Sequence, residues 1–181
     1  MEGRTYIGTV TSVSPGKRKL RIEMPTSYTA YALSLSVLEI EQRDGTTLKC
    51  RVSASSAAND GISVSLVAGV PRDTIAQLKK SLIVADTDAV VRDPNRYDME
   101  ELVGLSVYDA EGAQVGSVAS AFKTRANGMV ELKRLDASTI VLPVVPEVVD
   151  SVDWLANRLL LKSGVPLDGA IDDDEDKTVL A

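Results

Sequence analysis

Four cations between positions 17 and 21 are the residues with the clearest capacity for chemistry. Lys17, Arg18, Lys19 and Arg21 form the densest positive cluster in the chain. Lysine and arginine bind the phosphates of a nucleic-acid backbone and supply affinity that does not depend on base sequence. The cluster therefore predicts a phosphate-contacting surface, and a solvated turn and strand face is an equally open alternative.

Catalytic chemistry has few candidate residues in this chain. Histidine is absent, which removes the commonest general base and the commonest metal ligand. The single cysteine, Cys50, lies in the strand-like segment TLKCRVS, where a small buried hydrophobe is favoured over a catalytic thiol. The acidic run Asp172 to Asp176 lies in a tail that would not hold ligands in a defined geometry. We therefore expect no enzymatic activity, no metal site and no cofactor.

The charge of the chain is divided unevenly along its length. Residues 1–92 contain 12 Lys and Arg against 9 Asp and Glu, a balance of +3, whereas residues 93–181 contain 8 against 17, a balance of −9. Such asymmetry suggests two domains that face different partners. The weakly basic half suits a nucleic acid, and the acidic half suits a basic protein.

Length and composition favour a globular β protein. The 181 residues, 44% of them apolar, allow one large or two small domains with a real core. Valine, isoleucine and threonine are abundant, and no long amphipathic helical pattern appears. No apolar run approaches the roughly 18 residues that span a bilayer, and the N-terminus lacks a signal segment. We expect a cytoplasmic protein without membrane contact.

The first half is predicted to form a small barrel of short strands. The expected strands are 5–13, 17–24, 33–40, 46–53 and 62–67, with loops over 25–32 and 54–61. A helix is expected after Pro71, with Asp73 or Thr74 as its N-cap. Segments 82–84 and 89–91 can add a last strand, and residues 93–97 are expected to be a linker.

The second half opens with a helical turn followed by a hairpin. Met99, Leu102 and Val103 fall on one face of a helical turn, which Gly104 ends. Residues 105–108 and 115–124 are expected to pair, with Gly116 at a bulge or a close backbone approach. Further strands are expected over 129–135, 139–145, 148–154 and 158–162, in a small antiparallel barrel or sheet, before an acidic, disordered tail over 171–181.

These segments carry a resemblance to a known family. The run LVGLSVYDAEGAQVGSV, followed by TIVLPVVPEVVDSVDWLANRLLLK, is similar to a PRC-barrel domain. Together with Gly8 and with Gly69-Val70 ahead of a helix and a strand, it resembles the RimM family of ribosome maturation factors over most of residues 5–170. The resemblance implies a mainly β fold of two small β-barrel domains, an N-terminal barrel over 1–92 with one short helix and a PRC-barrel over 98–170.

The resemblance also implies function and partners. Such proteins bind the immature 30S subunit and assist assembly of its head without catalysis. The second domain would bind a head protein, the nineteenth of the small subunit, and the first domain would lie toward immature 16S rRNA. We expect a monomer, in which Lys17, Arg18, Lys19 and Arg21 are candidate rRNA contacts. The candidate contacts to the ribosomal protein are Tyr97, Leu102, Val103 and Tyr108.

Several of these assignments have structural alternatives. Leu102 and Val103 are better suited to the core, Tyr97 could cap the barrel, and Tyr108 could be an ordinary strand residue. Trp154, the single tryptophan, is favoured as a core residue at a barrel end over an interface anchor.

The chain departs from the family pattern in three places. It carries Ser14-Pro15-Gly16 where a His-Gly turn is usual, and only Tyr97 remains of an aromatic set before the hairpin. The helix of the first domain lacks its usual glycine and has Lys80 or Ser81 instead. An alternative function is a PRC-barrel interaction module outside the ribosome. A general single-strand RNA binder is disfavoured by the 4% aromatic content.

Overall fold

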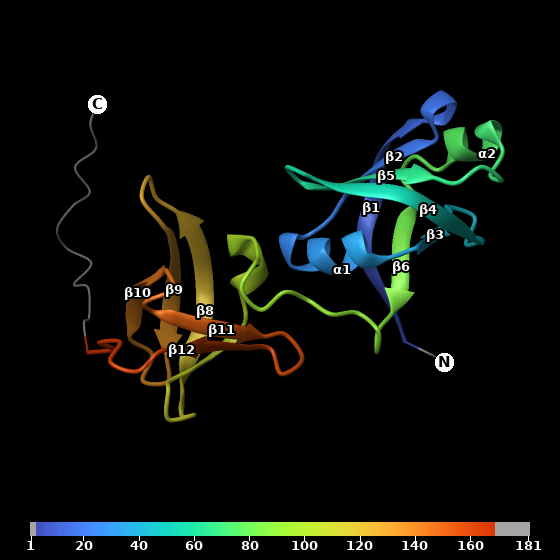
Figure 1. Cartoon of the computed structure of the whole chain (residues 1–181). Helices are drawn as coiled ribbons and strands as arrows, with labels where there is room; N and C mark the ends of the chain where they lie inside the picture. The colour runs from blue at the N-terminus through green and yellow to red at the C-terminus, as the bar shows by residue number, and fades with distance from the viewer. Residues whose placement is uncertain (1–2, 169–181) are drawn as a thin grey trace. The chain divides into compact units, whose positions relative to one another are not determined.

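The chain folds into two units that divide between Tyr97 and Asp98 (Figure 1). The structure, a computed structural model, describes residues 3–168. Mainly β structure with a barrel in the first half, as expected from the sequence, is confirmed. Within the described residues, no helix is long and apolar enough to cross a membrane.

The first unit is a closed barrel of six strands in the order β1-β2-β5-β4-β3-β6. The strands are β1 (Arg4–Ser14), β2 (Lys19–Glu23), β3 (Val37–Glu41), β4 (Thr47–Ala58), β5 (Gly61–Leu66) and β6 (Leu82–Asp86). Alternation places the apolar side chains inside: Ile62, Val64 and Leu66 of β5 are buried, while Ser63 and Ser65 are only half-buried. Closure pairs every strand on both sides.

Short helical segments close the ends of this barrel. They are η1 (Pro15–Lys17), η2 (Thr26–Tyr28), α1 (Thr29–Ser34) and α2 (Arg72–Gln77). The N-cap of α2 is Pro71 and not Asp73 or Thr74, and Asp73 instead lies in the first turn, where its charge favours the helix dipole. Ile75 and Leu78 bury the inner face of this segment.

The second unit is a six-stranded sheet in the order β10-β9-β8-β7-β12-β11. Its elements are η3 (Met99–Leu102), β7 (Ser106–Tyr108), β8 (Gln114–Lys123), β9 (Gly128–Arg134), β10 (Thr139–Val144), β11 (Val149–Asp153) and β12 (Arg158–Leu161). The pairing of β12 with β7 is parallel, so the expectation of a purely antiparallel arrangement is wrong at this pair. Sequence alternation shows that strands exist, but not which distant strands meet.

The helical turn at the start of the second unit forms as expected. Met99 and Leu102 are buried, and η3 packs against β8 and β9. A capping box joins Asp98 and Glu101 at its start. The close backbone approach at Gly116 is confirmed, because a Cβ there would lie 2.3 Å from the carbonyl oxygen of Lys133.

The expected loop over 25–32 and strand over 33–40 are corrected by the structure. Residues 26–34 form η2 and α1, and the strand begins only at Val37. The alternation of Leu33 and Leu35 with serines suggested a strand. The buried residues are instead Thr29 and Ala32, which have helical spacing. The first unit therefore contains two short α-helices, where one was expected.

Two other boundaries also move. Strand β4 continues to Ala58 through the small residues that were expected to form a loop, because its backbone pairs with β5 from Val52 to Ala58. Residues 89–91 are not a strand: Ala89 and Val90 donate backbone hydrogen bonds to the carbonyl of Asp86 in a turn. The expected disordered tail over 171–181 lies outside the described residues.

The segment between the units begins on the first unit. The guanidinium of Arg92 lies 4.9 Å from the centre of the Tyr28 ring and donates to the hydroxyl of Ser27 at 2.9 Å. The N–H of Asp93 donates to the carbonyl of Ser27. The start of the predicted linker over 93–97 is therefore held by η2.

Candidate nucleic-acid and protein interfaces

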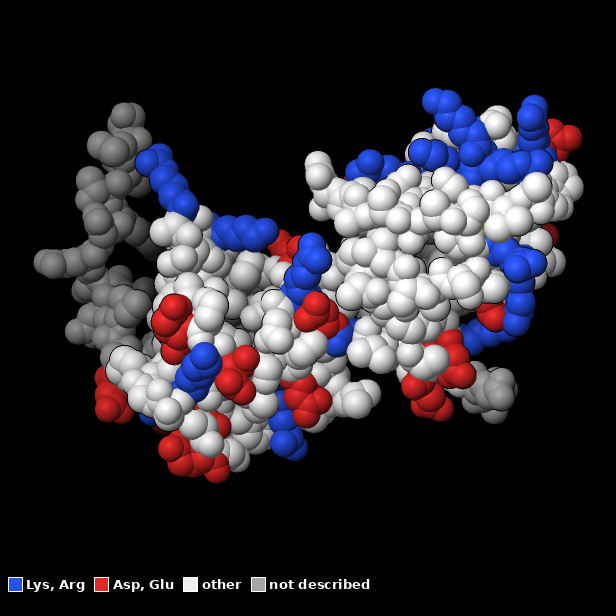
Figure 2. All heavy atoms as spheres, viewed as in Figure 1, with Lys and Arg blue, Asp and Glu red and all other residues white. Residues whose placement is uncertain are grey.

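Cations gather at one end of the first barrel, which we call the basic end. Figure 2 shows Lys and Arg gathered over η1, β2 and α2, with an acidic side chain beside them and further Asp and Glu along the side and at the opposite end of the unit. We use this name for Lys17, Arg18 and Lys19 of η1 and the start of β2, for Arg72, Lys79 and Lys80 in and after α2, which contacts η1, and for Arg51, which shares a hollow with the loop before α2; Asp73 lies in the first turn of the same helix. The basic end draws on three separated stretches of sequence, of which the prediction named only the first.

Packing between η1, β5 and α2 creates the basic end. The Nη1 of Arg18 donates to the carbonyl of Val70 at 2.7 Å, and the Arg18 carbonyl accepts from Leu66 at 2.9 Å. The N–H of Lys80 donates to the carbonyl of Val10 at 2.7 Å. The Arg18 bonds hold the β1–β2 turn beside the loop that leads to α2, and the Lys80 bond holds the segment after α2 against β1. Cations far apart in sequence are therefore brought together.

The four predicted rRNA contacts are not equivalent. Lys17 and Lys19 are exposed and form no ion pair with any other residue in the described part of the chain. Arg18 is half-buried and already donates to the loop before α2. Arg21 is paired with an acid: its Nη2 lies 2.6 Å from Oδ1 of Asp60. Phosphate contacts at this site remain a prediction. Lys17 and Lys19 are the best candidates of the four, because their side chains are exposed and are not engaged in an ion pair within the described residues.

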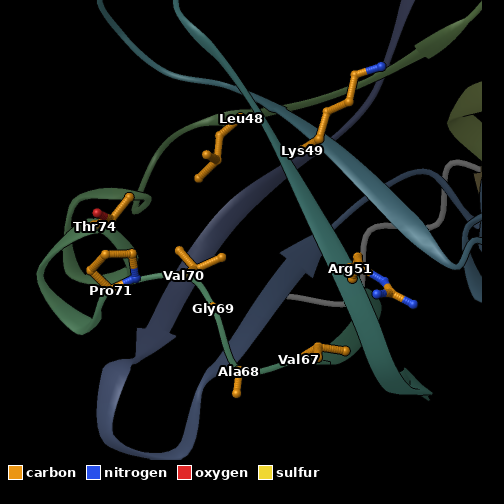
Figure 3. Close-up of a pocket in the computed structure, with 9 residues that line it drawn as sticks. All are labelled: Leu48, Lys49, Arg51, Val67, Ala68, Gly69, Val70, Pro71 and Thr74. Carbon is orange, nitrogen blue, oxygen red and sulfur yellow. The ribbon is translucent and has the colours of Figure 1, made fainter.

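A hollow of about 360 Å³ lies beside the basic end, between β4 and the loop that leads to α2 (Figure 3). Leu48 from β4 and Val70 from the loop point toward one another across it. Lys49 and Arg51 extend outward from β4 at its rim. The other residues that line it are Val67, Ala68, Gly69, Pro71 and Thr74. The hollow thus has aliphatic side chains within and cations at its edge.

The candidate protein contacts of the second unit lie at different depths. Leu102 is fully buried, so its side chain belongs to the core and cannot face a partner without unfolding. Its neighbour Val103 is 49% exposed, which corrects the preference for a core position there. Of this pair, only Val103 presents an apolar side chain at the surface.

The two tyrosines predicted as contacts are each partly covered. Arg158 lies over the ring of Tyr108, with its Cζ 4.6 Å from the ring centre. Tyr97, the last residue of the first unit, is half-buried, and burial raises the pKa of its phenol. A partner at Tyr108 would therefore meet a ring and a guanidinium together.

The turn between β11 and β12 contains an exposed residue that sequence reasoning missed. Leu155 is 96% exposed, and its N–H donates to Oδ1 of Asp153, which fixes the turn. Trp154 beside it is half-buried and so is not a core residue. The carbonyl of Asn157 accepts from Ser106, which places this turn next to the start of β7. The signal available in the sequence was a leucine within a turn.

The lone cysteine is a core residue, as expected. Cys50 is fully buried in β4, and burial raises the pKa of its thiol. The protonated thiol is therefore favoured at neutral pH. Among residues 3–168, no three His, Cys, Asp or Glu side chains lie close enough together to hold a metal ion.

A family model and several relatives match this chain. The model described as the RimM PRC barrel domain matches residues 99–164. The ribosome maturation factor RimM of Roseiflexus castenholzii is 28% identical over 116 residues, which cover 63% of this chain and 64% of that protein. The RimM of Nitrobacter winogradskyi is 27% identical over 148 residues, covering 81% and 82%.

A solved structure is also similar. RimM from Pseudomonas aeruginosa aligns with a TM-score of 0.43 and 20% identity, over 88% of this chain and 97% of that one. The match to the Roseiflexus castenholzii protein spans less than two thirds of that relative's length.

Proposed function

We propose that the chain is a member of the RimM family and a ribosome maturation factor of the small subunit that acts by binding, without catalysis. Relatives that match it are named ribosome maturation factor RimM. The proposed partners are the immature 30S subunit, its 16S rRNA and the nineteenth protein of that subunit. We place the protein in the cytoplasm as a monomer.

The observation that carries the proposal is the separation of charge between the two units. Residues 1–97 have a balance of +3, and residues 98–181 have a balance of −9. A polyanion is attracted to the basic end of the first unit, whereas a basic ribosomal protein is attracted to the second. Complementary charge mainly sets the rate and orientation of encounter.

Apolar contacts would then supply much of the affinity for the ribosomal protein. Val103 is the exposed apolar residue among the predicted contacts. At Tyr108 a partner would meet the phenol ring together with the guanidinium of Arg158 that lies over it. Leu102 supports Val103 from the core. Tyr97 stands at the division between the units, where the aromatic set of the family is reduced to one ring.

Sedimentation tests the proposal directly. The full chain is expected to co-sediment with immature small subunits and not with mature ribosomes. Equal binding to both particles, or binding to neither, would contradict the proposed function.

Two full-length variants test the division of labour. Lys17→Gln combined with Lys19→Gln should weaken binding to 16S rRNA fragments and leave binding to the purified ribosomal protein unchanged. Val103→Asp should have the opposite effect, because it places a charge on an exposed apolar contact. If the lysine variant instead loses the ribosomal protein, the assignment of the two units is wrong.

A further inference from the structure

We propose that the hollow between β4 and the β5–α2 loop receives one unpaired RNA nucleotide, with its base inside and its phosphates against the cations at the rim. The inference rests on the proposed function and deepens it. It names the feature of the RNA that the first unit would read, beyond the general attraction of phosphate to the basic end.

The hollow exists because two strands of the barrel separate. β4 pairs with β5 only from Val52 to Ala58, while its earlier part, Thr47 to Arg51, pairs with β3. The last bond on the β5 side runs from the N–H of Val67 to the carbonyl of Arg51, at 2.9 Å. Beyond it the chain turns away from β4 toward α2, and the space left open is the hollow.

The walls of the hollow suit the faces of a base. Leu48, Val67, Val70 and Pro71 are aliphatic and come from both sides. About 360 Å³ is room for one base and part of its ribose, but not for a tract of stacked bases. Aromatic residues are scarce in this chain, which disfavours a stacking platform for single strands. A single inserted nucleotide needs only apolar walls, and the nearby guanidinium of Arg51 can add a planar contact.

The loop also offers hydrogen-bond donors. The N–H groups of Ala68 and Gly69 donate to no other residue in the part of the chain that the structure describes. Gly69 has φ +139, and a Cβ there would meet no atom within 4 Å. Backbone geometry, and not lack of space, therefore requires glycine. Exposed amides in a fixed loop can donate to acceptors on the edge of a base.

The charge at the rim favours a nucleotide over a segment of a basic protein. Arg51 is exposed and forms no ion pair within residues 3–168, and Arg18 uses one of its five N–H groups on Val70. Lys49 is engaged by Glu39 at 2.7 Å but remains 70% exposed. These cations would repel the basic segments of ribosomal proteins. An acidic peptide has compatible charge, so the test includes one.

The test compares two RNA hairpins that differ by one nucleotide. The full chain is titrated, by fluorescence anisotropy, with a hairpin of fully paired stem and with the same hairpin carrying one bulged adenosine. We expect the bulged hairpin to bind roughly fivefold more tightly, the order that burial of part of one base against aliphatic walls supplies. Replacing the adenosine with 2-aminopurine should give a fluorescence change on binding.

Variants connect the preference to the hollow. Val67→Asp puts a carboxylate in the wall and should bring the affinity ratio of the two hairpins to one. Val91→Asp is the matched control, because Val91 is 69% exposed in the same unit and does not line the hollow. The readout is the ratio of the two hairpin affinities, because a general loss of electrostatic attraction lowers the affinity for both hairpins equally. Arg51→Gln, on an exposed side chain, provides a second test if Val67→Asp unfolds the barrel.

The outcomes separate this inference from the proposed function. Equal affinity for the two hairpins overturns the inference and leaves the proposed function standing. Failure to bind either hairpin, together with failure to sediment with immature subunits, overturns both. A synthetic peptide of residues 171–181 is the acidic alternative. If Val67→Asp abolishes binding of this peptide while the hairpins show no difference, the hollow is a peptide site and the inference is wrong.

Discussion

Arg21 in β2 donates from Nη2 to Oδ1 of Asp60, at 2.6 Å, in the turn between β4 and β5. Beside this ion pair, the N–H of Met24 donates to the carbonyl of Asp60. The two contacts hold the β4–β5 turn against the end of β2. Of the four cations predicted to contact RNA, Arg21 is thus the one with an ion-pair partner among residues 3–168.

The Arg21 hydrogen bond and charge lower the pKa of Asp60 below its ordinary value. A lowered pKa means that the interaction stabilises the fold above the ordinary pKa of aspartate and is lost as pH falls through the lowered value. Arg21→Gln should therefore raise the pKa of Asp60 toward the ordinary value, measured by carbon-detected NMR titration. Asp44 is the internal control, because the Thr46 hydroxyl lowers its pKa and the variant leaves that contact intact. An unchanged Asp60 titration would contradict the ion pair.

Salt dependence should distinguish the cations of the first unit. Each lysine that contacts phosphate contributes about one to the slope of log affinity against log salt concentration. Lys17→Gln combined with Lys19→Gln should reduce that slope by about two for a duplex RNA. Arg21→Gln should change it by less than one, because Asp60 already neutralises that side chain. A larger loss from the arginine variant would show that RNA displaces Asp60.

Periodicity was sufficient to find strands whose apolar positions all face one core. In β5, the sequence ISVSLV places Ile62, Val64 and Leu66 inside, and the expected and observed strands agree within a residue at each end. The same rule failed at Leu33 and Leu35, where alternation coincided with a helix that buries Thr29 and Ala32. A short amphipathic segment can match both the alternation of a strand and the spacing of a helix, and contacts with the rest of the barrel decide which one forms.

The sites depended on contacts that a linear pattern does not contain. The hollow opens where the pairing of β4 with β5 ends, beyond the bond between Val67 and Arg51. Whether Arg21 is paired depends on Asp60, 39 positions away. The second unit shows the same limit, since the parallel pairing of β7 with β12 joins strands about 50 residues apart. The family motif identified this domain from its glycines and apolar positions before any of these contacts could be known.

Gly116→Ala should destabilise the second unit. The added Cβ would lie 2.3 Å from the Lys133 carbonyl in the neighbouring strand, so backbone must shift. We expect a loss of about 2 kcal/mol or more in the free energy of unfolding, as for overpacked sites. Urea denaturation followed by Trp154 fluorescence reports on this unit, because Trp154 is the single tryptophan.

A second glycine separates a steric clash from backbone strain. Gly112 has φ +85, with no atom within 4 Å of the position a Cβ would take. Gly112→Ala should therefore cost only about 1 kcal/mol, the cost of a left-handed conformation for a residue with a Cβ. If Gly112→Ala proves more destabilising than Gly116→Ala, the close strand approach at Gly116 is wrong.

The capping box at the start of η3 predicts a pair of unequal variants. Asp98 accepts from the backbone at Glu101, and the Glu101 carboxylate accepts from the N–H of Asp98 at 2.8 Å. Asp98→Ala removes the N-cap acceptor and should lower the stability of the second unit by about 1 kcal/mol. Glu101→Gln keeps an acceptor at the same position and should change stability much less. Equal losses in Trp154-detected denaturation would contradict the capping geometry.

Leu155 offers a test of the protein interface that leaves the fold intact. An apolar side chain that is 96% exposed contributes almost nothing to the core, so Leu155→Ser should leave the free energy of unfolding unchanged. If the partner covers the β11–β12 turn, which the Ser106–Asn157 bond places beside β7, the variant should weaken binding of the ribosomal protein several-fold.

Leu135→Ser is the matched control, because Leu135 is 72% exposed after β9 and was not proposed as a contact. Isothermal titration with the purified ribosomal protein measures both variants. A loss confined to Leu155→Ser would extend the interface from Val103 to this turn, whereas equal effects of the two variants would remove Leu155 from it.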